Sequence, residues 1–309
     1  MLHGSPACLL HNWGSIMSRN WPPAVVAIAL AANLALSNGC STSGLAVRAM
    51  VPILENSKTQ ALASNDIRTF YAATPGSLFL LEGLIATDPN NNDLRLNASM
   101  LYFSYGFTFD APEDESYASI LYLKGLEHGR AVLLGEKRVA DIWDASFNEF
   151  KTGLDKLTAK DLPALMWTVS NWSQYISLHL DSTGVLLDIP RVTAILDRIC
   201  EIDGTFFEGL PHIILGSLHA FRPPLMGGDP VASKEHFDRA IAISEGKFLL
   251  AYYFYAKFYA YRIQDDEIFE NALNQVLGQP DSVLPEYQLL NAIAREKATR
   301  LLGEKDELF

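Results

Sequence analysis

The chain has 309 residues, of which 49% are hydrophobic and 19% are charged, and its formal net charge is −12. This length and composition are those of a folded globular protein with one large domain or two small ones, and they exclude extended disorder. An acidic surface repels phosphate backbones, and no stripe of Lys or Arg offsets it. We therefore expect no nucleic-acid partner.

Residues 1–39 are typical of a secretory signal peptide. An apolar run over 24–36 follows Arg19, and it is too short to cross a bilayer, which takes about 20 residues. Met17 is an ordinary start for such a signal, and a start there would leave residues 1–16 outside the protein. N-terminal sequencing of the precursor decides between the two starts.

The signal ends on a small residue, Gly39, which is followed by Cys40 and Ser41. This arrangement resembles a bacterial lipoprotein signal, in which the cysteine is acylated and becomes the new N-terminus. Such signals usually carry Leu three residues before the cysteine, whereas here Ser37 holds that place and the leucine is Leu36. The alternative is an ordinary signal peptide with a coincidental cysteine. By the usual sorting rule, Ser41 favours the outer membrane, so we expect a periplasmic, lipid-anchored protein.

Beyond the anchor, apolar residues recur with a helical period, and the alternating pattern of strands is absent. We expect a lipid-anchored tether and first turn over 40–60 and a helical domain over 61–309. The fold class is therefore all-α. The predicted helices cover 66–86, 94–107, 116–134, 141–154, 162–180, 190–201, 206–221, 231–244, 248–263, 266–277 and 285–302.

Two of these helices carry a similar sequence. The segment HFDRAI around Phe237 recurs as IFENAL around Phe269, and Ala240 and Ala272 are likewise 32 residues apart. Small residues where two helices cross, with an aromatic residue on the same face, are typical of stacked helix–turn–helix repeats of about 34 residues. The full tetratricopeptide (TPR) signature is missing. We predict an α-solenoid of diverged TPR-like helix–turn–helix repeats.

The sequence contains no motif for catalysis, metal binding or cofactor binding. Zincin, nucleophile-elbow and phosphate-loop patterns are absent, so we expect neither an enzyme nor a cofactor. His212 and His219 lie seven residues apart, further than the three or four typical of zinc pairs on a helix. We interpret Cys200 as a small buried hydrophobic residue. Acidic clusters at 113–115 and 265–267 stand at expected helix starts, where the helix dipole favours negative charge.

An aromatic segment, 252–261, carries Tyr and Phe on more than one helix face, so its rings cannot all point to one core. They either pack between helices or line a cleft, where Lys257 would contact an anionic ligand. Trp167 and Asn171 share a helix face and allow the same two interpretations. Polar groups amid aromatics suit a concave ligand surface. The candidate ligand-binding residues are therefore Asn171, Trp172, His212, Arg222, Lys257 and Tyr259.

Most of residues 40–309 resemble the T component (TatT) associated with TRAP (tripartite ATP-independent periplasmic) transporters. No single motif is as specific as a set of metal ligands, and the resemblance rests on the combination of several segments. The matching segments are Gly209-Leu210-Pro211-His212, Arg222-Pro223, Gly227-Gly228-Asp229-Pro230, His236-Phe237, the helix around Leu121–Gly125, the Trp167 and Trp172 segment, and the C-terminal run over 289–302.

The resemblance implies a periplasmic lipoprotein of TPR-like helices that assembles as a homo-trimer. It further implies association with the periplasmic solute-binding protein of a TRAP system, and a small apolar or anionic ligand in a cleft or pore. It supplies no catalytic residues. We thus expect a non-catalytic adaptor or scaffold of a TRAP-type transport system, held at the membrane by its N-terminal lipid. The alternatives are a general cell-envelope TPR scaffold and, from a different class, a periplasmic hydrolase.

Overall fold

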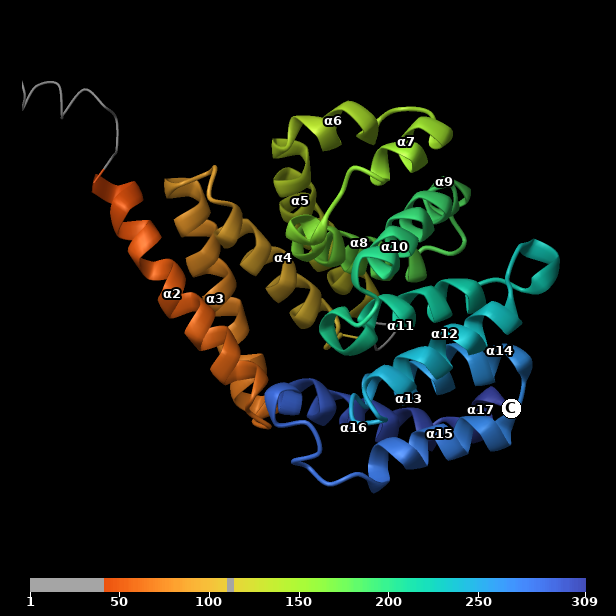
Figure 1. Cartoon of the computed structure of the whole chain (residues 1–309). Helices are drawn as coiled ribbons and strands as arrows, with labels where there is room; N and C mark the ends of the chain where they lie inside the picture. The colour runs from red at the N-terminus through yellow and green to blue at the C-terminus, as the bar shows by residue number, and fades with distance from the viewer. Residues whose placement is uncertain (1–41, 110–113) are drawn as a thin grey trace, which may run out of the picture. The chain divides into compact units, whose positions relative to one another are not determined.

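The structure is a computed structural model that describes residues 42–109 and 114–309 (Figure 1). The chain divides into two compact units, residues 1–48 and 49–309. Among the described residues, every helix lies in the second unit except the first turns of α2, which precede residue 49. The expected signal peptide over 1–39 and the lipid-attachment residue Cys40 lie outside the described residues.

The described residues form helices and no strand, which confirms the all-α prediction. None of these helices is both long enough and apolar enough to cross a membrane. The longer helices are α2 (Thr42–Leu62), α3 (Ile67–Thr87), α4 (Asn92–Gly106), α5 (Glu115–Gly135), α8 (Leu162–Ser177), α10 (Ile189–Asp203), α11 (Phe206–Ala220), α12 (Pro230–Ile243), α15 (Asp266–Gly278) and α16 (Gln288–Gly303). The shorter elements are α6 (Lys137–Trp143), α7 (Phe147–Leu154), η3 (Ala159–Asp161), α9 (Thr183–Leu186), η4 (Pro224–Met226), α13 (Leu250–Phe254), η5 (Tyr255–Ala260), α14 (Tyr261–Ile263), η6 (Pro285–Tyr287) and α17 (Lys305–Leu308).

The first described helix corrects the expectation of a tether and first turn over 40–60. α2 runs without a break for 21 residues. The Ser, Thr and Gly residues that suggested a tether occupy only its first turn, whereas Ala, Leu, Met, Glu and Lys, which are good helix formers, follow. Residues 49–62 of this helix belong to the second unit.

Glycines bring α4, α5 and α8 into close contact. A methyl group at Gly125 would lie 2.2 Å from the Asn171 Oδ1 atom, and one at Gly129 would lie 2.5 Å from the Thr168 Oγ1 atom. The same crossing is joined by buried hydrogen bonds. The Ser99 hydroxyl donates to the Gly125 carbonyl at 2.7 Å, and the Asn171 amide donates to the Ser99 carbonyl at 3.0 Å. These three helices therefore pack at a distance that only glycine allows.

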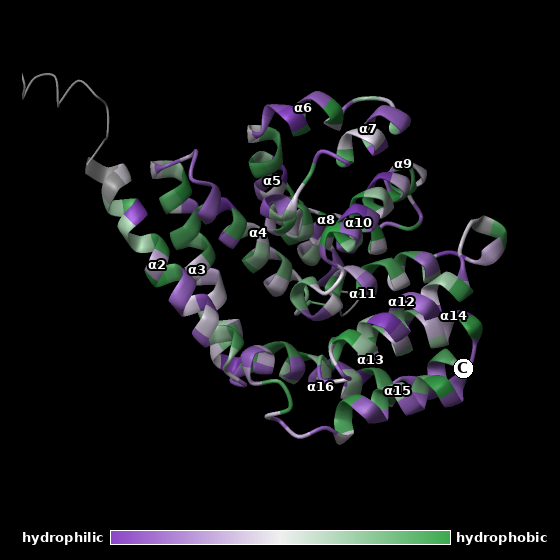
Figure 2. Ribbon diagram, in the orientation of Figure 1, coloured by the Kyte–Doolittle hydropathy of each residue, from purple (hydrophilic) through white to green (hydrophobic). Residues whose placement is uncertain are grey.

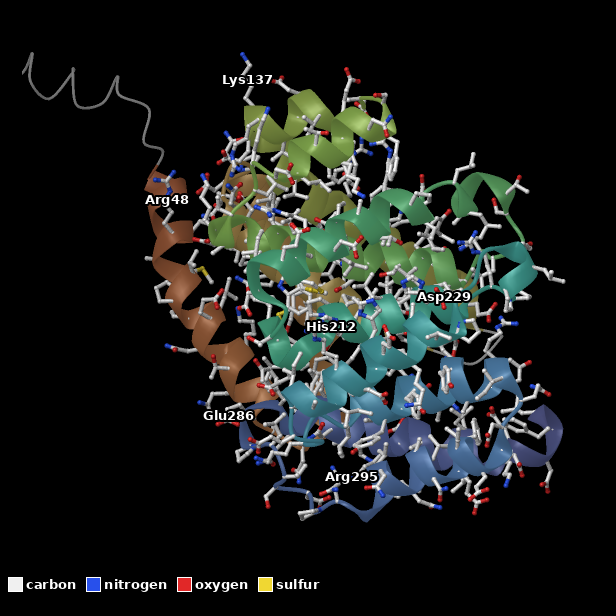
Figure 3. The ribbon with its side chains drawn as sticks, turned by 45° about the vertical axis from the view of Figure 1, so that its right-hand side comes forward. Arg48, Lys137, His212, Asp229, Glu286 and Arg295 are labelled. Carbon is white, nitrogen blue, oxygen red and sulfur yellow. The ribbon has the colours of Figure 1, made fainter. Side chains whose placement is uncertain are left out.

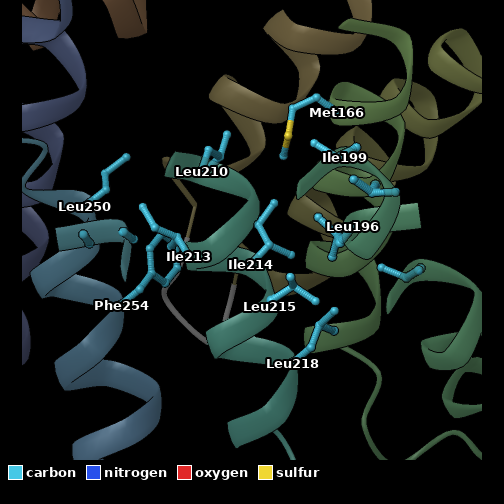
Figure 4. Packing of buried hydrophobic residues seen from close by; sticks show 14 of the residues in the cluster. Met166, Leu196, Ile199, Leu210, Ile213, Ile214, Leu215, Leu218, Leu250 and Phe254 are labelled. Carbon is cyan, nitrogen blue, oxygen red and sulfur yellow. The ribbon is translucent and has the colours of Figure 1, made fainter. Parts of the chain in front are cut away.

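α11 lies within the hydrophobic core. Figure 4 shows Ile213 directed toward Phe254 of α13 and Leu196 on the opposite side of α11, and Leu210 and Leu250 belong to the same core. All five side chains are buried. Several outer helices, such as α12 and α15, carry both hydrophobic and hydrophilic residues (Figure 2), as expected when one face packs inward. α8 and α11 are instead buried over most of their length.

Two predicted helices are interrupted. The single helix predicted over 141–154 is two helices, because Ser146 and Glu149 form a reciprocal capping box that starts α7. The helix predicted over 248–263 contains a π-helical turn at Tyr255–Ala260 between α13 and α14. The starts of α12 and α15 agree with their capping residues, since Asp229 and Asp265 accept hydrogen bonds from the first turns of these helices.

Candidate functional site

An apolar groove lies between α2, α3, α4 and α16 of the second unit. Its volume is about 360 Å³, which is within the range of small-molecule sites. Most of its wall is aliphatic or aromatic carbon. The principal apolar residues of the wall are Leu54, Phe70, Leu81, Met100, Leu101 and Leu290.

Polar side chains gather where α2 meets α4. The Asn97 amide donates to a Glu55 carboxylate oxygen at 2.7 Å, and Lys58 forms an ion pair with the same carboxylate. Burial raises the pKa of Glu55, but the hydrogen bonds from Lys58 and Asn97 outweigh it and hold that pKa below its usual value. Lys58 and Asn97 both line the groove. The groove wall also includes Asp66, the N-cap of α3, so it combines apolar carbon with a few charged and amide groups. Such a wall suits a molecule that is mostly apolar and carries a polar group.

A second, much smaller apolar space, the inner pocket, lies next to the groove. Met100, Ser104 and Leu290 line both spaces. The inner pocket has a volume of only about 20 Å³. The rest of its wall consists of Leu210, Leu250 and the aromatic rings of Phe103, Phe107, Trp167, Phe207, Phe248 and Phe254.

Two of the candidate ligand-binding residues serve in helix packing. The Asn171 side chain is fully buried, and besides Ser99 it donates to the Trp167 carbonyl at 2.8 Å. The Trp172 indole donates to Asp188 at 3.1 Å and stacks on Trp143 with ring centres 5.9 Å apart. Both side chains therefore join α8 to neighbouring segments.

His212, labelled in Figure 3, belongs to a histidine cluster that sequence spacing did not reveal. Its Nδ1 atom lies 3.0 Å from the Nδ1 atom of His236, whose ring stacks on His219 at 5.6 Å. Burial lowers the pKa of all three rings, and the neighbouring histidines and Arg239 help to lower the pKa of His236 to about 4. The cluster is therefore neutral at pH 7.

Cys200 lies beside this cluster, with its Sγ atom 3.8 Å from His212 Nδ1. Burial raises the pKa of the Cys200 thiol to about 12, so the side chain is a thiol and not a reactive thiolate. Over residues 42–109 and 114–309, no group of three or more His, Cys, Asp or Glu side chains is arranged to hold a metal ion.

The other three candidates lie on the C-terminal half of the chain. An Arg222 nitrogen approaches the Gly227 carbonyl at 3.5 Å, and the Lys257 ammonium lies over the Tyr253 and Phe258 rings. Tyr259 is buried and stacks on its neighbour Tyr255 at 4.9 Å. Within the described part of the chain, no hydrogen bond or ring contact joins any two of the six candidates, and none lines the groove. Their role as a ligand site stays a prediction.

The groove itself was missed by sequence reasoning. Its wall consists of Leu, Ala, Ser and Met residues that look like ordinary core positions of α3, α4 and α16. Its fourth wall, α2, was interpreted as a tether. The one available signal was the helix-forming composition of residues 45–62, which predicts an additional helix that needs a packing partner.

Residues 63–309 match the model of a protein family described as the TRAP transporter T-component. None of the curated proteins compared with the chain matches it. The match includes α3, α4 and α16 of the groove, whereas α2 precedes it. It covers most of the chain and confirms the resemblance seen in the sequence. The chain belongs to the TRAP transporter T-component (TAtT) family.

Proposed function

We propose that this protein is a non-catalytic adaptor of a TRAP transport system that holds an apolar ligand in the groove between α2, α3, α4 and α16. The observation that carries the proposal is an apolar groove of about 360 Å³ in a chain of a transporter-component family. In this proposal Cys40 is acylated, and the lipid holds the protein at the periplasmic side of the outer membrane.

The groove can supply most of the binding free energy through apolar burial. Each methylene of a ligand that leaves water contributes about 0.8 kcal/mol. A chain of about eight methylenes thus contributes roughly 6 kcal/mol before the cost of ordering the ligand is subtracted. The polar end of the ligand lies beside Lys58 and Asn97, which fix its direction.

Two further features support an adaptor. Phe237, Ala240, Phe269 and Ala272, the residues of the repeated segment, are all buried on α12 and α15, as an α-solenoid of diverged TPR-like repeats requires. Large apolar side chains also stay exposed, among them Phe79 at 80%. Exposed apolar surface suits contact with other proteins, here the solute-binding protein and the further copies of a homo-trimer.

The chemistry of the buried titratable groups supports a role without catalysis. Cys200 is kept as a thiol and the three clustered histidines are kept neutral, so the cluster offers no activated nucleophile. The groove wall contains no histidine or cysteine.

Purification of the full chain from its host tests both parts of this proposal. Organic extraction followed by mass spectrometry should release a mostly apolar compound, and the solute-binding protein of a TRAP system should co-purify. Recovery of envelope-assembly proteins without a solute-binding protein would instead favour the general envelope scaffold. Extraction of no apolar compound, from protein purified without detergent exchange, would count against the groove as a ligand site.

A further inference from the structure

The first residues of α11 make one turn of left-handed backbone. Phe207, Glu208 and Gly209 have φ/ψ values of 49/55, 58/31 and 79/20 degrees. The left-handed region suits Gly209, but Phe207 and Glu208 carry a Cβ atom that makes it unfavourable. The helical spacing of apolar residues had predicted an ordinary helix over 206–221, so the left-handed turn corrects that prediction.

Close packing holds this turn in place. Gly209 is buried, and a methyl group there would lie 3.3 Å from the Cα atom of Ala240 on α12. A strained backbone of this kind persists only where the surroundings determine it, and it is frequent at sites that bind ligands. The left-handed turn has one structural consequence that an ordinary helix start would not have.

That consequence is the position of the Phe207 ring. The ring meets Trp167 edge-on at 5.2 Å and lies 4.8 Å from Tyr287 and 6.2 Å from Phe248, measured between ring centres. These contacts favour the strained backbone through aromatic packing. With Trp167 and Phe248, the Phe207 ring lines the inner pocket and not the groove.

α4 lines both the groove and the inner pocket. Asn97 lines only the groove, Met100 and Ser104 line both spaces, and Phe107 lines only the inner pocket. From Asn97 to Phe107 the chain advances about 15 Å. α4 therefore runs from the polar side chains of the groove to the rings around Phe207.

We propose that Phe207 closes the inner end of the apolar groove and thereby sets the longest alkyl chain that the protein holds. The ligand class is a single-chain aliphatic amphiphile, with its polar end beside Lys58 and Asn97 and its chain directed toward Met100. This inference rests on the proposed function of the groove. In this proposal the left-handed turn holds the Phe207 ring at the inner end of the groove.

The test is a titration of the full chain with n-alkyl carboxylates from hexanoate to octadecanoate. In the unaltered protein the affinity should rise about fourfold per methylene and then stop rising at one chain length. In Phe207→Ala the rise should continue to longer chains and tighten the longest probes by about sixteenfold, since each of two more buried methylenes contributes about fourfold. Phe207→Gly should act in the same way, and its backbone suits the left-handed turn, which protects the test against misfolding.

A matched control removes a ring elsewhere. Phe150 is fully buried and packs on Trp143, outside both spaces, so Phe150→Ala should leave the limiting chain length unchanged. A second readout uses probes with bromine at the chain end, which quench a nearby tryptophan. They should quench Trp167 more strongly in Phe207→Ala, and Trp167→Phe should abolish that added quenching.

The possible outcomes distinguish the role of Phe207 from the proposed function of the groove. Alkyl probes that bind the unaltered protein with the same limiting length in both Phe207 variants would overturn the role of Phe207 and leave the groove as the ligand site. Failure of every alkyl probe to bind the unaltered protein would overturn the proposed function, and the inference with it. A limiting length that moves in both Phe207 variants but not in Phe150→Ala supports the inference.

Discussion

α3 and the helices around α11 differ in how their glycines are used. On α5 and α11, Gly129 and Gly216 let a neighbouring helix approach so closely that a methyl group would clash with Thr168 or Phe237. On α3, Gly76 and Gly83 have nothing within 4 Å of the position where a methyl group would stand. The same residue type thus gives dense packing in one region and open surface in the other. The dense region stabilises the fold, whereas the surface of α3 stays open at these two glycines.

The sharpest test of this difference is one substitution made in both regions. Gly129→Leu should cost more than about 3 kcal/mol of the free energy of unfolding, because α5 must move away from α8. Gly83→Leu should be neutral or stabilising by up to about 1 kcal/mol, because leucine is the better helix former and meets no obstacle. Urea unfolding followed by circular dichroism measures both. Equal losses in the two variants would contradict the assignment of α3 as open.

Asn171→Leu should have the next largest effect. The substitution removes hydrogen bonds to the Ser99 and Trp167 carbonyls in a fully buried place, and we expect a loss of about 1–3 kcal/mol in the free energy of unfolding. Alkyl-probe affinity should stay unchanged in protein that remains folded. A selective loss of probe binding without loss of stability would show that Asn171 is a ligand contact, as the sequence suggested.

The histidine cluster should make stability depend on pH. The pKa of His236 falls from 6.5 to about 4 on folding, so between these values the unfolded chain binds a proton that the folded chain does not. The contribution of His236 to the free energy of unfolding should therefore be fully present above pH 6.5 and should be lost as the pH falls toward 4. His212 and His219 should change the free energy in the same direction. In His236→Phe, the urea midpoint should change less with pH across this range. An unchanged slope in that variant would show that other groups cause the dependence.

Arg222→Ala and Lys257→Ala should have the smallest effects on stability, within about 1 kcal/mol, because both side chains are partly exposed. If these residues form a ligand or partner site, the substitutions should weaken binding of an anionic ligand or of the solute-binding protein. Surface-plasmon resonance with the immobilised full chain measures the partner affinity. Unchanged affinities in both variants would remove these residues from the candidate site.

The helical parts of this fold could be predicted where side chains act locally. The apolar period and the capping residues Asp66, Asn91, Asp229 and Asp265 mark the starts of α3, α4, α12 and α15 within one residue or two of their observed bounds. The break at Ser146 was predictable as well, because the spacing of Ser146 and Glu149 is that of a capping box. These features depend on residues within one turn of each other.

The features that distant contacts decide could not be predicted in the same way. The segment Phe206-Phe207-Glu208-Gly209 has ordinary helical spacing, and its left-handed turn follows from packing against Ala240 and from rings on α8 and η6. The groove likewise depends on the separation of four helices, which no single helix encodes. The meeting of His212 with His236 joins α11 to α12 and was not visible from the spacing of His212 and His219.

The central claim is that the groove holds an apolar ligand, and it is tested most directly by filling the groove. Ala73 and Ala86 are both exposed on α3, but only Ala73 lines the groove. We would titrate the full chain and both tryptophan variants with a fluorescent fatty acid. The account predicts that Ala73→Trp weakens binding at least tenfold whereas Ala86→Trp binds like the unaltered protein. Equal binding by both variants would contradict it.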